Sequence, residues 1–209
     1  MSDSQGTRRW GWVVGLVLAA LVLATLAIGL TRDYSSEPTI TLGGQTSDPR
    51  VGLELYEQGE RTPLPELTGQ DLDGQQLSTA DYPGKILVLN LWGSWCSPCR
   101  AEAPDLATTA RETAARGVQF LGIDTRDNLG GANAFVRRYA IPYPSFDDKA
   151  SNVLLDLTGL VPISAVPSTI FVDVDGGIAA RVIGQIDGST LQGLVDDLLA
   201  ERSASPAPS

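Results

Sequence analysis

Two cysteines separated by two residues are the only cysteines in this chain of 209 residues. They lie in the segment Trp95-Cys96-Ser97-Pro98-Cys99. This spacing lets both sulfurs close one small disulfide ring. A dithiol that interconverts with a disulfide can exchange electrons with the disulfides of other molecules. The cysteine pair is therefore the first candidate for chemistry in this sequence.

The residues around the pair predict a strand, a short turn and a helix. Residues 85–92, KILVLNLW, form a compact apolar run that is typical of a buried strand. Residues 100–116 are rich in alanine, glutamate and arginine, which favours a helix. A CxxC pair between a strand and a helix is typical of a redox motif.

The helix gives the two cysteines different roles. Unpaired backbone N–H groups and the helix dipole stabilise a thiolate at the helix N-terminus, where we place Cys96. We expect Cys96 to form the mixed disulfide with a partner. Cys99 lies one turn further in, where we expect it to be more buried and to resolve that disulfide. Pro98 suits the first helical turn because its missing N–H costs nothing there.

Two other uses of a cysteine pair are disfavoured. A tetrahedral zinc site takes about four nitrogen or sulfur ligands, and this chain contains no histidine. A structural disulfide normally closes a long loop, whereas this one would add little stability. We therefore predict a redox pair that works without a metal or another cofactor.

An uncharged segment near the N-terminus predicts a membrane anchor. Residues 10–30 carry no charge and are long enough for a transmembrane helix, which needs about 20 residues. Arg8 and Arg9 precede this segment, so the positive-inside rule puts residues 1–9 in the cytoplasm. The rest of the chain would then lie outside a single-pass anchor in the cell membrane. The alternative is a signal peptide cleaved near Ala27, but the apolar run exceeds the usual h-region of about 7–15 residues.

The remaining chain predicts one α/β domain. Residues 31–62 read as a linker with a short element at 53–56, residues 63–202 as the domain, and residues 203–209 as a disordered tail. Strands alternate with helices and end in a hairpin and a helix, which indicates a mixed sheet with helices on both faces.

The formal net charge of −10 disfavours a nucleic-acid partner. The expected elements are a hairpin within 64–77, strands at 86–92, 118–123, 168–174 and 178–183, and helices at 130–139, 150–157 and 189–201.

Several motifs in order resemble one family. Residues 63–201 are similar to the ResA/TlpA/CcmG-type membrane-anchored thioredoxin-like oxidoreductases. The stretch LVLNLWGSWCSPCRAEAPDL resembles the active site of that family, and Pro104 matches its proline five residues after the second cysteine. Residues 165–169, AVPST, resemble the family's cis-proline loop, and residues 129–157 resemble its helical insert. The resemblance implies a thioredoxin-like fold, with a central mixed sheet, an N-terminal hairpin and that insert.

The resemblance also implies further site residues. The Val166–Pro167 peptide would be cis, with this loop against the two sulfurs and the Val166 backbone pairing with an extended client segment. Glu102 would lie close to the cysteines and act as their acid or base. Thioredoxins proper carry a buried aspartate where this chain has Asn90, which cannot titrate, so Glu102 is the remaining candidate. We expect Trp95 and Pro98 to contact the partner.

Four aspartates near strand ends carry no predicted role. We expect them to be solvated; they are Asp124, Asp127, Asp147 and Asp148.

These observations predict an extracytoplasmic thiol–disulfide oxidoreductase. The family's usual work is to reduce disulfides in client proteins such as apocytochrome c, with electrons from a membrane protein of the CcdA or DsbD type. A disulfide-forming oxidase of the DsbA kind stays open because direction depends on the reduction potential. A redox-inert binding module also stays open, although the intact CxxC argues against it. A peroxidase is disfavoured because the residues before Cys96 do not match Pro-x-x-x-Thr/Ser-x-x-Cys. A copper chaperone is disfavoured by the absence of histidine.

Overall fold

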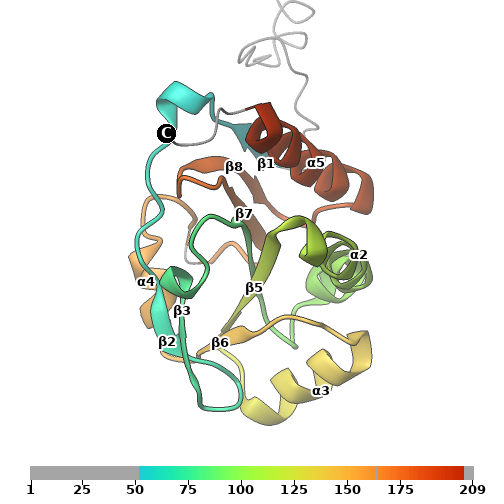
Figure 1. Ribbon diagram of the computed structural model, residues 1–209. Helices are drawn as coiled ribbons and strands as arrows, with labels where there is room; N and C mark the ends of the chain where they lie inside the picture. Colours follow the sequence, from blue (N-terminus) through green and yellow to red (C-terminus); the bar gives the residue numbers. More distant parts are fainter. Residues whose placement is uncertain (1–51, 163, 205–209) are drawn as a thin grey trace, which may run out of the picture. The chain divides into compact units, whose positions relative to one another are not determined.

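A mixed sheet of six strands forms the centre of the molecule (Figure 1). The computed structural model describes residues 52–162 and 164–204. The strands lie in the order β1-β8-β7-β4-β5-β6, in which β4, β5 and β6 are parallel and the others are antiparallel to their neighbours. Their bounds are Gly52–Leu55 for β1, Ile86–Trp92 for β4, Val118–Thr125 for β5, Ser145–Asp148 for β6, Ser168–Val172 for β7 and Ile178–Ile183 for β8.

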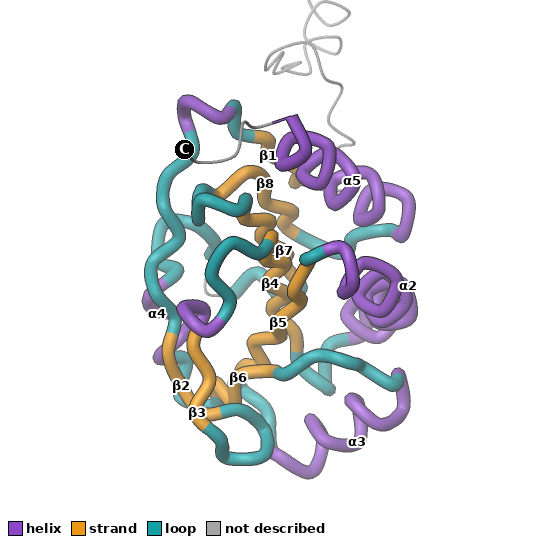
Figure 2. The backbone as a smooth tube through the Cα atoms, in the orientation of Figure 1, coloured by secondary structure: helices purple, strands orange, loops and turns teal. Residues whose placement is uncertain are grey.

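Helices and a small hairpin cover the two faces of this sheet (Figure 2). Helices α2 and α5 lie on one face, and α4 lies with the hairpin β2–β3 on the other. Short 3-10 helices span Gln58–Glu60, Thr79–Asp81 and Ala114–Arg116. The remaining bounds are Ser97–Thr113 for α2, Leu129–Tyr139 for α3, Asn152–Asp156 for α4, Gly188–Ala204 for α5, Thr68–Gln70 for β2 and Gln76–Ser78 for β3.

The central strand β4 is buried along its whole length because both of its faces are covered. Its alternate side chains enter two different cores. Val88 packs with Leu106 of α2 and Leu191 of α5, whereas Leu89 packs with Leu154 of α4 and Leu67 before the hairpin. Strand β4 therefore contributes side chains to both hydrophobic cores. Its bounds are those that the sequence predicted.

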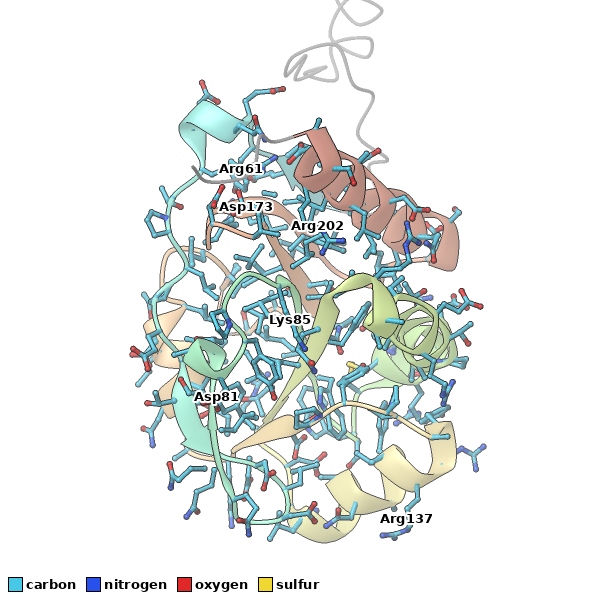
Figure 3. The ribbon with its side chains drawn as sticks, viewed as in Figure 1. Arg61, Asp81, Lys85, Arg137, Asp173 and Arg202 are labelled. Atoms are coloured by element: carbon cyan, nitrogen blue, oxygen red, sulfur yellow. A yellow bond between two sulfur atoms is a disulfide. The ribbon has the colours of Figure 1, made fainter. Side chains whose placement is uncertain are left out.

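The sheet begins upstream of residue 63, where we expected the domain to start. Strand β1 pairs antiparallel with β8, although residues 52–55 fall in the predicted linker. Arg61 then binds Asp173 after β7 and Glu201 of α5, at 2.9 and 2.8 Å (Figure 3). This part of the predicted linker is thus part of the folded unit.

Two further expectations differ from the structure. The segment 129–157 contains helices α3 and α4, but it also supplies the edge strand β6, which pairs parallel with β5. Helix α5 extends to Ala204, so the predicted disordered tail starts inside a helix.

The predicted membrane segment 10–30 lies outside the described residues. Within 52–162 and 164–204, no helix is long and apolar enough to cross a membrane.

Gly122 lies at a tightly packed point in the middle of the sheet, and a substitution there can test this packing. A Cβ atom there would lie 2.1 Å from Ser145 Oγ and 2.6 Å from Trp92 Nε1, two atoms that are hydrogen-bonded to each other. We predict that Gly122→Ala lowers the free energy of unfolding by about 1–3 kcal/mol because the core is overpacked. Urea denaturation measures this change.

Gly193 provides the matched control. It lies in α5 and a Cβ atom there meets nothing within 4 Å. Gly193→Ala should therefore stabilise the protein, by about 0.5–1 kcal/mol. Equal effects of the two substitutions would contradict this account of the sheet.

Candidate active site

The two cysteines form a disulfide at the start of α2. Cys96 is the N-cap residue, with extended backbone angles, and its Sγ accepts a hydrogen bond from the Cys99 N–H at 3.1 Å. This is the helix-terminal position that the sequence predicted. Both residues are buried, with 3% of Cys96 and 1% of Cys99 exposed. A thiolate on Cys96 would be stabilised by the N–H groups of this first turn.

An exposed rim borders the buried pair. Trp95 is 48% exposed, and its indole Nε1 donates to the Thr125 carbonyl at 3.3 Å. The guanidinium of Arg126 lies over the indole ring, 5.1 Å from its centre, which is within cation–π range. Pro98 is also exposed on the first turn of α2. Trp95 and Pro98 therefore lie on the surface beside the disulfide, where a partner can reach them.

The cis-proline loop packs against the cluster that contains the two cysteines. The Val166–Pro167 peptide is cis, as the sequence predicted. Val166 is half-buried and packs against a cluster that contains Cys96, Cys99 and Trp92. The Pro167 carbonyl accepts from the Gly184 N–H at 2.9 Å, which ties the loop to the end of β8. The fold thus brings residues about 70 positions apart in the sequence to one site.

Glu102 lies one turn after Cys99 on α2 and is 1% exposed. Its Oε1 accepts from Asn90 Nδ2 at 2.9 Å, and its Oε2 accepts from the Ile186 N–H at 3.0 Å. Burial raises the pKa of Glu102 from 4.5 to about 7, and these two hydrogen bonds act in the opposite direction. A carboxyl group with a pKa near 7 can both take up and release a proton at neutral pH.

Asn90 connects this carboxyl group to the rest of the site. Its Nδ2 also donates to Thr169 Oγ1 at 3.2 Å, two residues after the cis-proline. Asn90 and Cys99 both line a cavity of about 10 Å³, which has room for about one water molecule. The sequence singled out Asn90 only as a residue that cannot titrate. Its role as the link between Glu102, β7 and the surroundings of Cys99 depends on contacts across the fold.

The four aspartates that we expected to be solvated are largely covered, so that expectation is wrong. Asp124 and Asp148 are buried, Asp127 is 9% exposed, and Asp147 is half-buried. For Asp127 and Asp148 the reason is their place after β5 and at the end of β6, where backbone N–H groups need acceptors. Asp148 accepts from the first N–H groups of α4, and Asp127 accepts from the N–H groups of Ser94 and Asn128.

Asp124 differs from Asp127 and Asp148 because its buried Oδ1 has no hydrogen-bond partner among the described residues. Burial raises its pKa to about 8, and the nearby carboxyl groups of Asp127 and Asp147 add to the rise. Within the described residues, no group of three or more potential ligands is arranged to hold a metal ion.

The comparisons agree on the kind of protein this chain resembles. The AhpC/TSA family model matches residues 61–181. The thiol–disulfide oxidoreductase ResA of Bacillus cereus is 26% identical over 134 residues, which cover 64% of this chain and 75% of that protein. A DsbF homologue from Corynebacterium diphtheriae is 36% identical, with a TM-score of 0.66, over 74% of this chain and 98% of that one. A secreted thiol–disulfide isomerase from Corynebacterium glutamicum is 31% identical, with a TM-score of 0.68, over 75% and 97% of the two chains.

The raised pKa of Glu102 predicts a pH-dependent stability. The folded state holds this proton more tightly than the unfolded state, so the stabilisation is complete below pH 4.5 and is lost as the pH rises to about 7. Between these limits, wild type should lose on the order of 3 kcal/mol relative to Glu102→Gln, which cannot titrate. Urea denaturation of the oxidised protein at a series of pH values measures the difference.

Glu112 provides the control, because it lies on the same helix and is exposed. Glu112→Gln should leave the pH dependence of wild type unchanged. If the Glu102→Gln curve runs parallel to that of wild type, the buried carboxyl group does not titrate as described.

Proposed function

This chain belongs to the AhpC/TSA family, and we propose that it reduces disulfides of client proteins outside the cytoplasm. It is a thiol–disulfide oxidoreductase of the ResA/DsbE type, with Cys96 and Cys99 as its redox-active pair. The direction rests on the arrangement of the site, the client on the resemblance to ResA-type proteins, and the location on the uncharged segment 10–30.

The observation that carries the proposal is the buried carboxyl group of Glu102 on the helix of the cysteines. Strong oxidants such as DsbA have an unstable disulfide because their reduced form is stabilised as a thiolate. A carboxylate near the pair acts in the opposite direction, since its charge disfavours a second negative charge. The dithiol is then held in its protonated form away from a client, which suits a reductase.

The reaction follows from the two different sulfur positions. The Cys96 thiolate attacks a client disulfide, forms a mixed disulfide and releases one client thiolate. Cys99 then gives up its proton, for which Glu102 is the acceptor, and attacks the Cys96 sulfur. This step releases the second client thiolate and leaves the Cys96–Cys99 disulfide. The client gains two electrons and the pair loses two, which a membrane donor of the CcdA or DsbD type returns.

The surroundings of the disulfide provide a place for an extended client segment. Trp95 and Pro98 border the pair on one side and Val166 on the other. The Val166 N–H donates to the Ser164 carbonyl, so the Val166 carbonyl is the group that a client strand would engage first. Apocytochrome c, whose cysteines must be reduced before haem attachment, is the client that we assign.

A peroxidase is a weaker candidate despite the family's name. The peroxidatic pattern requires a proline seven residues and a threonine or serine three residues before the cysteine. In this chain those positions are Leu89 and Gly93, a buried strand residue and a glycine. The oxidase and the redox-inert module stay as alternatives to the reductase.

The N-terminal segment 10–30 would hold the domain at the outer face of the cell membrane. A relative from Corynebacterium glutamicum is described as secreted, which agrees with work outside the cytoplasm. An anchor would also keep the pair close to a membrane electron donor.

Removal of the resolving cysteine should trap the client. We predict that Cys99→Ser accumulates a covalent adduct between Cys96 and a client, because no second thiol can break the mixed disulfide. Cys96→Ser should trap little, since Cys96 is the N-cap residue whose thiolate the helix N-terminus favours, whereas Cys99 lies one turn further into α2. Non-reducing electrophoresis of cell extracts shows the adducts, and mass spectrometry identifies the client.

The outcomes separate the parts of the proposal. Adducts that contain apocytochrome c support the assigned client. If Cys96→Ser traps and Cys99→Ser does not, the roles of the two cysteines are reversed. Adducts with many secreted proteins and none with apocytochrome c would replace the assigned client by a general one.

A further inference from the structure

The end of β5 holds the turn that leads to Cys96. The Ser94 N–H donates to Asp127 Oδ2 at 2.5 Å, and the Trp95 indole donates to the Thr125 carbonyl. Arg126 covers the Trp95 ring. Three consecutive residues of the chain, 125–127, therefore contact the two residues that precede the nucleophilic cysteine.

Asp127 is tightly enclosed at this point. Its Oδ1 accepts from the Asn128 N–H at 2.8 Å, so both of its oxygens are engaged. Gly131 of α3 lies against the same place, where an added Cβ would come within 2.6 Å of Ser94 Oγ and 3.0 Å of Asp127 Oδ1. Because the Ser94 N–H is bound to Asp127 and Gly131 lies close to both side chains, a shift of the Asp127 carboxylate disturbs the Ser94 turn.

Asp124 lies near the end of β5, three residues before Asp127. It is in register with Trp92, the last residue of β4, and with Asp147 of β6. The residue is 1% exposed, and its Oδ1 has no hydrogen-bond partner among the described residues. A buried ionised carboxylate in this state would be costly, whereas a protonated one has a hydrogen to donate.

The groups around Asp124 identify the acceptor. The charged groups that face it are all acidic: Asp127 from the turn after β5, and Asp147 and Asp148 from β6. Its neighbour on β4, Trp92, carries no charge. The side chain of Asp127 is within hydrogen-bonding reach, and such a bond favours the protonated form of Asp124.

We propose that Asp124 is a positioning residue for disulfide exchange: its protonated carboxyl group donates to the Asp127 carboxylate, which in turn holds the Ser94 N–H and the turn that carries Cys96. When Asp124 loses its proton, its carboxylate and that of Asp127 repel each other. This repulsion displaces the Asp127 side chain. The turn then loosens, and Cys96 and Trp95 lose their fixed positions. This inference rests on disulfide exchange at Cys96 and Cys99 and not on the assigned client or direction.

Few groups in this chain titrate near neutral pH, so loss of the Asp124 proton can be observed directly. The chain has no histidine, and in the oxidised protein both cysteines are in the disulfide. The groups that usually titrate near neutrality are therefore missing. Glu102, with a pKa of about 7, and Asp124, with a pKa of about 8, remain, and substitution can separate them. The terminal amine is common to all variants.

The test is a pH titration of tryptophan fluorescence in the oxidised full-length protein. Wild type should show a step with a midpoint near pH 8, which Asp124→Asn removes because an amide donates to Asp127 at every pH. The matched control is Asp147→Asn, which removes one neighbouring charge. In that variant the step should persist and move to lower pH.

Kinetics provide a second measurement that a purely structural role would not move. Reduction of the disulfide by dithiothreitol should proceed at similar rates in wild type and Asp124→Asn at pH 6. At pH 9 wild type should be slower by about threefold, the size expected for one hydrogen bond. A step near pH 8 that survives in Asp124→Asn, or a rate ratio that does not change with pH, would overturn the proposal.

A measurement on wild type covers the case in which Asp124→Asn does not fold. The amide proton of Ser94 reports its hydrogen bond to Asp127 directly in an NMR titration. Its chemical shift should change with a midpoint near pH 8. A Ser94 amide that does not respond between pH 7 and pH 9 would exclude the role of Asp124.

Discussion

The active site is organised around the buried carboxyl group of Glu102, which must receive hydrogen bonds from its surroundings. Glu102 accepts hydrogen bonds from Asn90 of β4 and from the Ile186 N–H before α5, and Asn90 also binds Thr169 of β7. A buried acid without these partners would be strongly destabilising. The helix of the cysteines, the central strand and the strand after the cis-proline are therefore held together by one polar network. Because burial and hydrogen bonding oppose each other, the network leaves the pKa of Glu102 near 7 instead of at either extreme.

A pair of acidic residues, Asp124 and Asp127, lies near the turn that precedes the nucleophile. Glu102 follows Cys99 within α2, whereas Asp124 lies at the end of β5, and Asp127 in the following turn accepts from the Ser94 N–H before Cys96. The two groups have different tasks in this account. In the function that we propose, Glu102 exchanges a proton with the resolving cysteine, and Asp124 keeps the turn of the attacking cysteine in place. The chain contains no histidine, so in this proposal carboxyl groups carry the acid–base chemistry that histidine often provides.

The local parts of this site could be predicted from the sequence, and the long-range parts could not. Strand β4 has the predicted bounds because an apolar run between a lysine and a glycine has few other interpretations. Cys96 as N-cap and the cis peptide before Pro167 follow from short motifs. The bond from Ile186 to Glu102 joins residues 84 positions apart, and no local pattern encodes it. The aspartates were misread because an acid at a strand end looks the same in sequence whether it faces water or caps a neighbouring turn. Strand β1 was missed as part of the sheet because its pairing with β8 depends on residues far along the chain.

We attribute the reducing character of this pair to Glu102, the buried acid on the helix of the cysteines. The most direct test is the equilibrium reduction potential of Cys96 and Cys99 in the full-length protein against glutathione or dithiothreitol at pH 7. The account predicts a potential well below that of DsbA, about −120 mV, and closer to that of thioredoxin, about −270 mV. It further predicts that Glu102→Gln has a higher potential than wild type, because the opposing charge is gone. A wild-type potential near −120 mV would contradict the account and identify the protein as a disulfide-forming oxidase.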